Sequence, residues 1–333
     1  MSAEYRAEVV IDLHQMVRQG LHRWAFSAQT EVTLLNLSEN ATFLARDPAT
    51  ENQLVLRVHR LHYSSVPEIY SELAWIGALR KECIVATAAP VAGINGRLVQ
   101  TLPSMGGYPG REVVAFEFLP GNEPDRTTDL AHRFWQLGEI NARLHGHARG
   151  WQKPTGFVRK RWDFDAMVGP QAYWGSWRVG LGLESSGVSL IEQVLALIGE
   201  KLHTFGMSPE RFGLVHADLR LANLLVDGDT LRVIDFDDCG FSWFMYDFAA
   251  AVSFIEHEPT MPTLMAAWIN GYRNVAPLDD EEVAMIPLFV MLRRILLTAW
   301  VASHAEVPFA RELGNEYTAG TLRLAAELLT KRL

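Results

Sequence analysis

One stretch, Leu214 to Asp247, constrains the fold more than any other part of the sequence, because it combines a polar loop with a hairpin. Two short apolar runs flank an Asp-Gly pair at 227–228, and this pair favours a tight turn between antiparallel strands. A hairpin holds the residues before it and after it close together. We therefore expect Asp218 and Asn223 to lie across a small space from Asp235.

These three side chains suit the transfer of a phosphoryl group. Carboxylate and amide oxygens are the ligands that Mg²⁺ prefers, and the ion is usually held by one or two carboxylates together with substrate phosphates. Transfer through a loose transition state needs alignment and charge neutralisation more than covalent chemistry. The alternative is structural: Asp218 and Asp235 would cap turns, and Asp247 would cap a helix.

The segment resembles the catalytic loop and metal motif of the aminoglycoside phosphotransferase and choline kinase superfamily. The resemblance lies in residues 216–223 (His-Ala-Asp-Leu-Arg-Leu-Ala-Asn) and 234–238 (Ile-Asp-Phe-Asp-Asp). Residues 246–249 (Tyr-Asp-Phe-Ala) match the segment that follows in that superfamily. Within the superfamily, the loop is most similar to that of type II homoserine kinases. Three parts in the right order and spacing are much more specific than any one of them.

This resemblance implies a bilobal, protein-kinase-like α+β fold, with a small antiparallel β-sheet lobe and a larger, mostly helical lobe. It implies that Asp218 accepts or orients the proton of the acceptor hydroxyl, and that Arg220 contacts the γ-phosphate or the acceptor. The implied magnesium ligands are Asn223, Asp235 and Asp237. Asp238 is adjacent, and the sequence does not separate its role from that of Asp237. His216 is expected to steady the loop by hydrogen bonding.

Arg57 departs from the superfamily pattern, because it occupies the place of a strand lysine that binds the α- and β-phosphates. The chain contains 25 arginines and 5 lysines, so an arginine that keeps the phosphate contact is the favoured interpretation. Arginine binds phosphate through a planar fork and is not equivalent to lysine. The alternatives are an exposed strand residue or an impaired site. Glu72 is the expected partner of Arg57, and Glu68 is the second choice.

Three further residues are expected at the nucleotide. Asn40 lies in the segment that corresponds to the phosphate-covering loop, which lacks glycines here; a plain hairpin turn is the alternative. Glu117 and Leu119 lie in a segment that resembles the hinge, where backbone groups pair with the adenine edge. The Pro-Gly pair at 120–121 marks the end of the small lobe.

The pattern of elements predicts three regions: an N-terminal helix in residues 1–29, a small nucleotide-binding lobe in 30–121, and a large helical lobe in 122–333 that carries the catalytic loop and the acceptor site. The Trp-rich stretch 151–187 has no clear period, and either packs between elements or lines the acceptor site. Strands are expected at 32–35, 42–45, 53–59, 85–91, 97–101 and 112–118. Helices are expected at 4–25, 67–79, 127–147, 188–205, 248–255, 263–272, 280–302 and 317–333.

The composition restricts the class of protein and of partner. An apolar content of 49% with 21% charged residues is typical of a soluble globular chain. The net charge of −9 argues against a broad nucleic-acid-binding face, which needs a basic stripe. The acidic N-terminus lacks the features of a signal peptide, and two cysteines suit a reducing compartment. We therefore expect a cytoplasmic protein with neither a nucleic-acid nor a membrane partner.

The sequence thus predicts a kinase that moves the γ-phosphate of ATP, with Mg²⁺, to a hydroxyl of a small molecule. Amino alcohols, amino acids and aminoglycosides are the acceptor classes that the resemblance suggests, and a metabolic role is favoured over antibiotic resistance. A protein Ser/Thr kinase of the same fold is the first alternative, although the segment between Asp235 and Asp247 is short for an activation loop. A catalytically weak nucleotide-binding protein is the second, and Arg57 motivates it.

Overall fold

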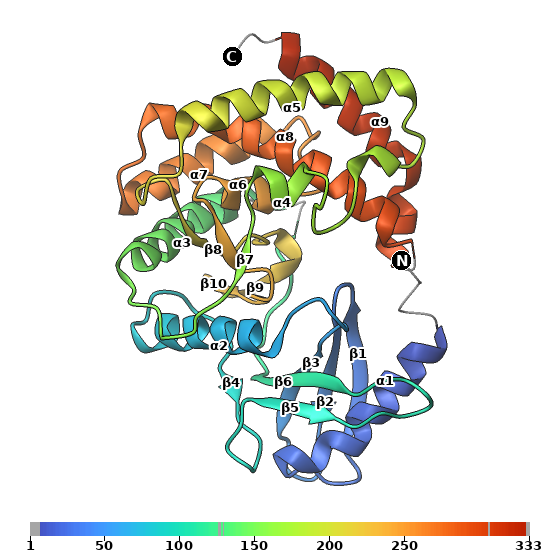
Figure 1. The fold of residues 1–333 in the computed structure, drawn as a ribbon. Helices are drawn as coiled ribbons and strands as arrows, with labels where there is room; N and C mark the ends of the chain where they lie inside the picture. Colours follow the sequence, from blue (N-terminus) through green and yellow to red (C-terminus); the bar gives the residue numbers. More distant parts are fainter. Residues whose placement is uncertain (1–6, 126–127, 129, 306, 331–333) are drawn as a thin grey trace. The chain divides into compact units, whose positions relative to one another are not determined.

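The computed structural model describes residues 7–125, 128, 130–305 and 307–330. These residues divide into two compact units (Figure 1). The first comprises the described residues up to Pro120 together with Lys153–Arg159, and the second comprises those of Gly121–Gln152 and Lys160–Leu333.

The first unit contains an antiparallel sheet. Among the described residues, six strands form it in the order β1-β2-β3-β6-β4, with β5 also paired to β6. The strands are β1 Glu31–Leu37, β2 Ala41–Arg46, β3 Gln53–Val58, β4 Pro90–Val91, β5 Val99–Leu102 and β6 Arg111–Glu117. The prediction of a strand over 85–91 was too long, because within that range only Pro90–Val91 form a strand, which pairs with β6. The carbonyl of Thr87 instead accepts a hydrogen bond from the Arg80 guanidinium.

Two helices accompany this sheet. Helix α1 (Ala7–Gly20) buries one apolar face against β2 and β3 in a shared core. A 3₁₀ turn over Leu21–Trp24 follows it, and residues 4–6 of the predicted helix lie outside the described part of the chain. Helix α2 (Val66–Lys81) begins at a capping box, in which Ser65 and Glu68 satisfy each other's backbone N–H groups. The Glu68 side chain therefore serves as part of the N-terminal cap of α2.

The second unit is mostly helical. Its helices are α3 Leu130–Gly150, α4 Phe164–Val168, α5 Ser185–Phe205, α6 Tyr246–Ala251, α7 Met261–Val275, α8 Asp280–Ser303 and α9 Pro308–Thr330. Helix α9 starts well before the predicted 317, and Gly314 interrupts it with a non-helical backbone. Residues 127, 129 and 331–333 of the predicted helices lie outside the described residues.

The predicted hairpin is confirmed. Strands β9 (Leu224–Asp227) and β10 (Thr230–Val233) pair antiparallel, and Gly228 takes a positive φ of 59° in the turn between them. The chain entering this unit is tied to the hairpin: the Asn122 N–H donates to the Val226 carbonyl over 3.1 Å, and the Val226 N–H donates to the Asn122 carbonyl over 2.7 Å. A side chain at Gly121 would bring its Cβ to 2.9 Å from that Val226 carbonyl.

A small three-stranded sheet in this unit was not predicted. Its order is β7-β11-β8, with β7 Lys160–Arg161, β8 Phe212–Val215 and β11 Gly240–Trp243. Strand β11 runs parallel to β7 and antiparallel to β8. Gly240 permits the approach of β7, because a Cβ there would lie 2.5 Å from the Lys160 carbonyl oxygen. The Trp-rich stretch thereby contributes a strand beside the metal motif.

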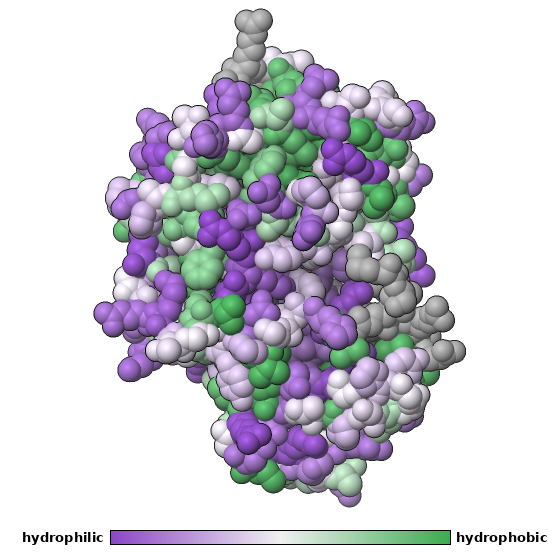
Figure 2. Space-filling model, viewed as in Figure 1, coloured by the Kyte–Doolittle hydropathy of each residue, from purple (hydrophilic) through white to green (hydrophobic). Residues whose placement is uncertain are grey.

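Helix α8 has the length and apolar composition of a membrane span, with a mean hydropathy of 1.7 in its most apolar window, and 83% of that window is buried inside the fold. It is the one helix of this kind among the described residues. Its burial identifies it as a core helix of the second unit. Hydrophilic and hydrophobic residues are interspersed on the face of the protein shown in Figure 2.

Helices α3 and α7 cross very closely, because each has a glycine at the contact. A Cβ at Gly138 would lie 2.1 Å from the Trp268 carbonyl oxygen, and one at Gly271 would lie 1.9 Å from the Trp135 carbonyl oxygen. Real Cβ atoms do not approach this closely, so the two backbones would have to separate. The crossing brings polar side chains of α3 to α7: the Trp268 indole donates to the Asn141 oxygen over 2.8 Å.

We predict that Gly271→Ala lowers the free energy of unfolding by about 3 kcal/mol, since overpacking of this kind forces backbone shifts. Gly146→Ala on α3 is the matched control, because a Cβ there meets no atom within 4 Å and the position is exposed. The control should be neutral or about 1 kcal/mol more stable. Urea unfolding of the variants measures both values, and equal stabilities would contradict the role of the crossing.

Candidate active site

The buried carboxylate of Asp247, in α6, holds the predicted catalytic loop to the helices beneath it. Two backbone N–H groups of the loop donate to it, from His216 over 3.3 Å and from Ala217 over 2.7 Å. Two side chains of α3 donate from the other side, Asn141 over 3.2 Å and His145 over 3.0 Å. A fully buried carboxylate with four donors is well satisfied, so it fixes the start of the loop.

His145 is fully buried, and its protonation state follows from its surroundings. Burial lowers the pKa of His145, although the hydrogen bond and the negative charge of Asp247 act in the opposite direction. Burial also raises the pKa of Tyr272 to about 12, so its hydroxyl keeps its proton. A neutral His145 can then donate through Nε2 to Asp247 and accept at Nδ1 from the Tyr272 hydroxyl over 3.1 Å.

His216 braces the loop from within, as the sequence suggested. Its Nδ1 accepts from the Asp218 backbone N–H over 3.3 Å, and its Nε2 donates to the Ile234 carbonyl over 3.2 Å. Its ring also packs on Phe236, with centroids 4.4 Å apart. Ala217, which lies between His216 and Asp218 in the sequence, has a positive φ of 68°. This conformation costs free energy in a residue with a side chain. The loop keeps this shape because its backbone groups are held on both sides.

Asp218 projects from this loop, and its carboxylate is held at both oxygens. The Asn223 amide donates to Oδ2 over 2.8 Å, and the Arg220 Nε donates to the same oxygen over 3.3 Å. The guanidinium of Arg293, in α8, donates to Oδ1 over 2.6 Å. The structure thus brings together Asp218, Arg220 and Asn223, and it adds the buried cation Arg293 from a distant helix.

Asn223 and Asp235 are linked through the backbone on either side of the hairpin. The Ile234 N–H donates to the Asn223 carbonyl over 3.0 Å, and Asp235 follows with a positive φ of 65°. Because the Asn223 side-chain nitrogen donates to Asp218, its oxygen is directed away from that carboxylate. Amide and carboxylate oxygens, of the kind that Asn223, Asp235 and Asp237 carry, are hard donors that suit Mg²⁺.

No group of three or more His, Cys, Asp and Glu side chains could hold a metal ion by itself in the part of the chain that the structure describes. A dedicated all-protein metal cage is therefore not built into these residues.

Asp238, the second of the two adjacent acids of the metal motif, has a partner in the Trp-rich stretch. Asp238 is paired with Lys160 of β7, with 2.9 Å between Nζ and Oδ1, and both side chains are buried. The Trp162 indole donates to the Asp238 carbonyl over 2.8 Å. The structure therefore gives the Asp238 side chain a buried cationic partner within the second unit. Sequence reasoning missed Lys160, because no local pattern links the Trp-rich stretch to the motif.

In the first unit, Arg57 and Glu72 form a buried ion pair. Nη2 of Arg57 lies 2.7 Å from each carboxylate oxygen, and the side chains are only 4% and 1% exposed. The Phe116 ring centroid lies 5.2 Å from the Arg57 guanidinium carbon. The structure therefore pairs Arg57 with Glu72 rather than with Glu68, and it excludes an exposed strand position for Arg57.

The remaining expected nucleotide contacts also lie in the first unit. Asn40 is buried, and its side-chain oxygen accepts the Arg60 N–H over 3.1 Å. The Glu117 carboxylate accepts the Ala89 N–H over 3.2 Å and lies 3.5 Å from the Arg80 guanidinium. Leu119 follows β6 outside any strand or helix. The Glu117 side chain thus has partners within the first unit.

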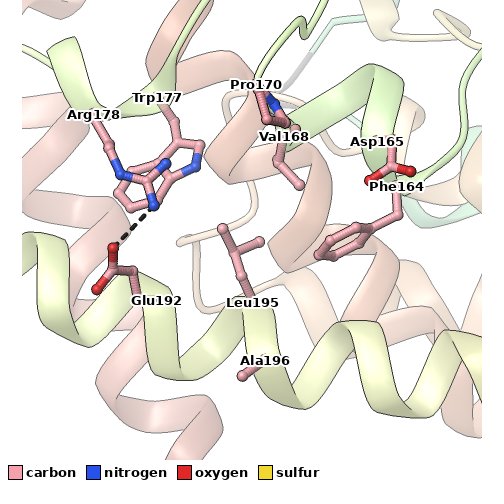
Figure 3. A pocket seen from close by; sticks show the side chains of 10 residues that line it. Phe164, Asp165, Val168, Pro170, Trp177, Arg178, Glu192, Leu195 and Ala196 are labelled. Atoms are coloured by element: carbon pink, nitrogen blue, oxygen red, sulfur yellow. Dashed lines mark hydrogen bonds and ion pairs between the residues drawn. The ribbon is translucent and has the colours of Figure 1, made fainter.

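A separate hollow of about 390 Å³ lies between α4, α5 and a 3₁₀ turn over Trp177–Val179 (Figure 3). Its floor and walls are mainly apolar, and an exposed ion pair between Arg178 and Glu192, 2.9 Å long, lies at its rim. None of the predicted site residues lines it. The hollow is therefore distinct from the cluster around Asp218.

His145 leads to a prediction about pH. Because its folded-state pKa lies below the ordinary value of 6.5, the unfolded chain binds more protons once the pH falls below that value. The stabilising contribution is present above it and is lost on acidification. As the pH falls through about 6.5, we expect His145 to contribute a slope of up to about 1.4 kcal/mol per pH unit to the free energy of unfolding. His145→Gln should remove this component in denaturant titrations, and an unchanged slope would contradict the buried neutral state.

Known proteins resemble this chain over most of its length. The model of the phosphotransferase enzyme family matches residues 31–282. The solved structure of a microcompartment-associated aminopropanol kinase is 42% identical with a TM-score of 0.88, and the match covers 95% of this chain and 98% of that one. The amicoumacin kinase of Bacillus subtilis is 24% identical over 94% of this chain and 95% of that protein. A homoserine kinase of Gluconobacter oxydans is 25% identical over 82% of this chain and 84% of that protein.

These similarities confirm the predicted superfamily, the α+β kinase-like fold and the class of reaction. The family match covers more than half of the chain, and it includes the loop at 216–223 and the metal motif at 234–238. The chain belongs to the phosphotransferase enzyme family and is an ATP-dependent kinase that phosphorylates a hydroxyl group of a small molecule.

Proposed function

We propose that the acceptor is a short amino alcohol and that transfer requires Mg²⁺. The observation that carries this proposal is the 42% identity to an aminopropanol kinase over 95% of this chain and 98% of the other. The amicoumacin and homoserine kinases are 24% and 25% identical, so they support the reaction class more than the acceptor.

The charges buried in the second unit support an acceptor that carries an ammonium group. Among the described residues, the buried carboxylates outnumber the buried cations even before Asp218, which is 16% exposed, is counted. The buried carboxylates are Asp237, Asp238, Asp247 and Glu256, and the buried cations are Lys160, Arg293 and Arg294. An excess of negative charge favours the arrival of positive groups, both the metal ion and an ammonium.

The same charges disfavour an amino acid as the acceptor. Each buried cation of this unit already faces a carboxylate: Lys160 faces Asp238, Arg293 faces Asp218 and Arg294 faces Glu256. The α-carboxylate of an amino acid would compete with these partners, and removing one partner of a buried pair is costly. An amino alcohol lacks that carboxylate.

In the proposed reaction, Asp218 accepts the hydrogen bond of the acceptor hydroxyl and directs its oxygen at the γ-phosphorus. Alignment is its main contribution, because the loose transition state of phosphoryl transfer requires little deprotonation beforehand. Arg220, which contacts Asp218, would reach the γ-phosphate as charge shifts on transfer. The metal, held by Asn223, Asp235 and Asp237, would neutralise phosphate charge.

On the nucleotide side, Arg57 binds the phosphates and Glu72 holds its guanidinium in place. A guanidinium with a fixed carboxylate partner loses little conformational freedom when it binds a phosphate. Asn40 supports the backbone of the phosphate-covering segment, while the backbone groups of Glu117 and Leu119 pair with the base. Because the reaction consumes ATP, we place the protein in the cytoplasm.

Asp218→Asn tests the catalytic assignment. We expect kcat for 1-amino-2-propanol to fall by about a thousandfold or more, because the amide cannot accept the proton and orients the hydroxyl poorly. The dissociation constant of Mg-ATP should stay within about threefold. Asp229→Asn, at an exposed position of the hairpin turn, is the control and should be fully active.

The acceptor is tested in the same assay with a panel of compounds. Wild-type protein should give the highest kcat/KM with 1-amino-2-propanol or ethanolamine, and a lower value with homoserine. Preference for homoserine would overturn the argument from buried charge. Phosphorylation of amicoumacin alone would assign a different acceptor class.

Removal of metal tests the proposed donor set. Chelation with EDTA should abolish transfer, and added Mg²⁺ should restore it, because the phosphates cannot be neutralised otherwise. Asp235→Asn should raise the Mg²⁺ concentration required for half-maximal rate by about tenfold or more. Calorimetric titration of ATP, with and without Mg²⁺, gives a second measurement. An equal affinity for free ATP and Mg-ATP in wild type would contradict a metal site here.

A further inference from the structure

We infer that Arg293 is a positioning residue for Asp218, acting from behind the carboxylate without touching either substrate. The inference rests on the proposed role of Asp218. Arg293 is only 2% exposed, whereas Asp218 is 16% exposed, so the carboxylate can reach a ligand and the guanidinium cannot. Its Nη2 lies 2.6 Å from Asp218 Oδ1, a short charge-assisted hydrogen bond.

The Arg293 guanidinium is itself fixed on all sides. Nη1 donates to the Tyr246 hydroxyl over 2.9 Å and to the Ala217 carbonyl over 3.3 Å, and Nε donates to the Ser253 hydroxyl over 3.3 Å. The Trp174 ring lies over it, with 5.3 Å between the ring centroid and the guanidinium carbon. The Arg293 guanidinium therefore cannot move with the Asp218 carboxylate, and rotation of that carboxylate would break the hydrogen bond between them.

This arrangement sets the plane of the Asp218 carboxylate. Arg293 holds one oxygen, and Asn223 with Arg220 holds the other, so rotation about the Cβ–Cγ bond would break a contact on each side. A carboxylate held in one orientation can align an acceptor hydroxyl, and misplacement by about 1 Å can cost about a hundredfold in rate. A lysine ammonium cannot replace the Arg293 guanidinium, because it acts as a point charge and makes fewer hydrogen bonds of fixed direction.

Arg294 provides a matched control on the same helix. It is also buried and also faces a carboxylate, with 3.1 Å between its Nη1 and Glu256 Oε2. Its other contacts are to α9, where Tyr317 and Thr321 accept its hydrogen bonds. Loss of the Arg294 guanidinium should therefore lower the stability of the fold as much as loss of the Arg293 guanidinium, but it should leave the contacts of Asp218 unchanged.

The experiment compares Arg293→Lys with Arg294→Lys in the full-length protein. We expect Arg293→Lys to lower kcat for 1-amino-2-propanol by about thirtyfold or more, with KM for ATP within about threefold. Arg294→Lys should keep kcat within about threefold, and the two melting temperatures should fall by similar amounts. Equal losses of kcat in both variants, or a wild-type kcat in Arg293→Lys, would overturn the inference.

Tyr246→Phe is the gentler second variant, because it removes one anchor of the Arg293 guanidinium and keeps the buried ring. It should lower kcat by about fivefold at an unchanged KM for ATP, and an unchanged kcat would count against the inference.

The double variant Asp218→Asn with Arg293→Lys separates this inference from the role of Asp218. If Arg293 acts through Asp218, adding Arg293→Lys to Asp218→Asn should change the residual single-turnover rate by less than about twofold. Multiplicative losses would show that Arg293 acts independently, and would overturn the inference alone. Full activity of Asp218→Asn would remove the proposed role of Asp218 first, whatever the Arg293 variants do.

Discussion

The rest of the site depends on the hydrogen bonds that the buried carboxylate of Asp247 accepts. A charge in the interior is costly unless hydrogen bonds replace the water that it loses, and here four donors do so. Two come from the catalytic loop and two from α3. Helix α3 crosses α7 closely at two glycines, and α7 contacts the same pair through Trp268 at Asn141 and Tyr272 at His145. The position of the catalytic loop is thus linked through Asp247 to the packing of α3.

Features set by neighbouring residues could be predicted from the sequence. The Asp-Gly pair and its flanking apolar runs indicated the hairpin, and the hairpin then placed Asn223 near Asp235. With a strand predicted at 53–59 and a helix at 67–79, the family resemblance favoured Glu72 over Glu68 as the partner of Arg57, and the ion pair agrees with that choice. The predicted bounds of α2, α3, α5, α7 and α8 lie within about three residues of the observed ones, whereas the start of α9 was missed because Gly314 interrupts that helix.

Features that depend on distant segments were missed. Strands β7 and β11 are too short to show a pattern, and they exist because Gly240 lets two segments about eighty residues apart approach closely. The Lys160–Asp238 pair is a result of that approach. Arg293 and Arg294 interrupt an apolar helix, which indicates buried cations, but only the folded chain shows that one faces Asp218 and the other faces Glu256.

The paired hydrogen bonds between Asn122 and Val226 have a mechanical consequence. They attach the first residues of the second unit to the hairpin that separates Asn223 from Asp235, and Gly121 makes the attachment close. A strain applied to the chain at Pro120 therefore acts on β9 before it reaches any helix of that unit. This passage of the chain from the first unit into the second is therefore coupled directly to the hairpin that carries the proposed metal ligands at its ends.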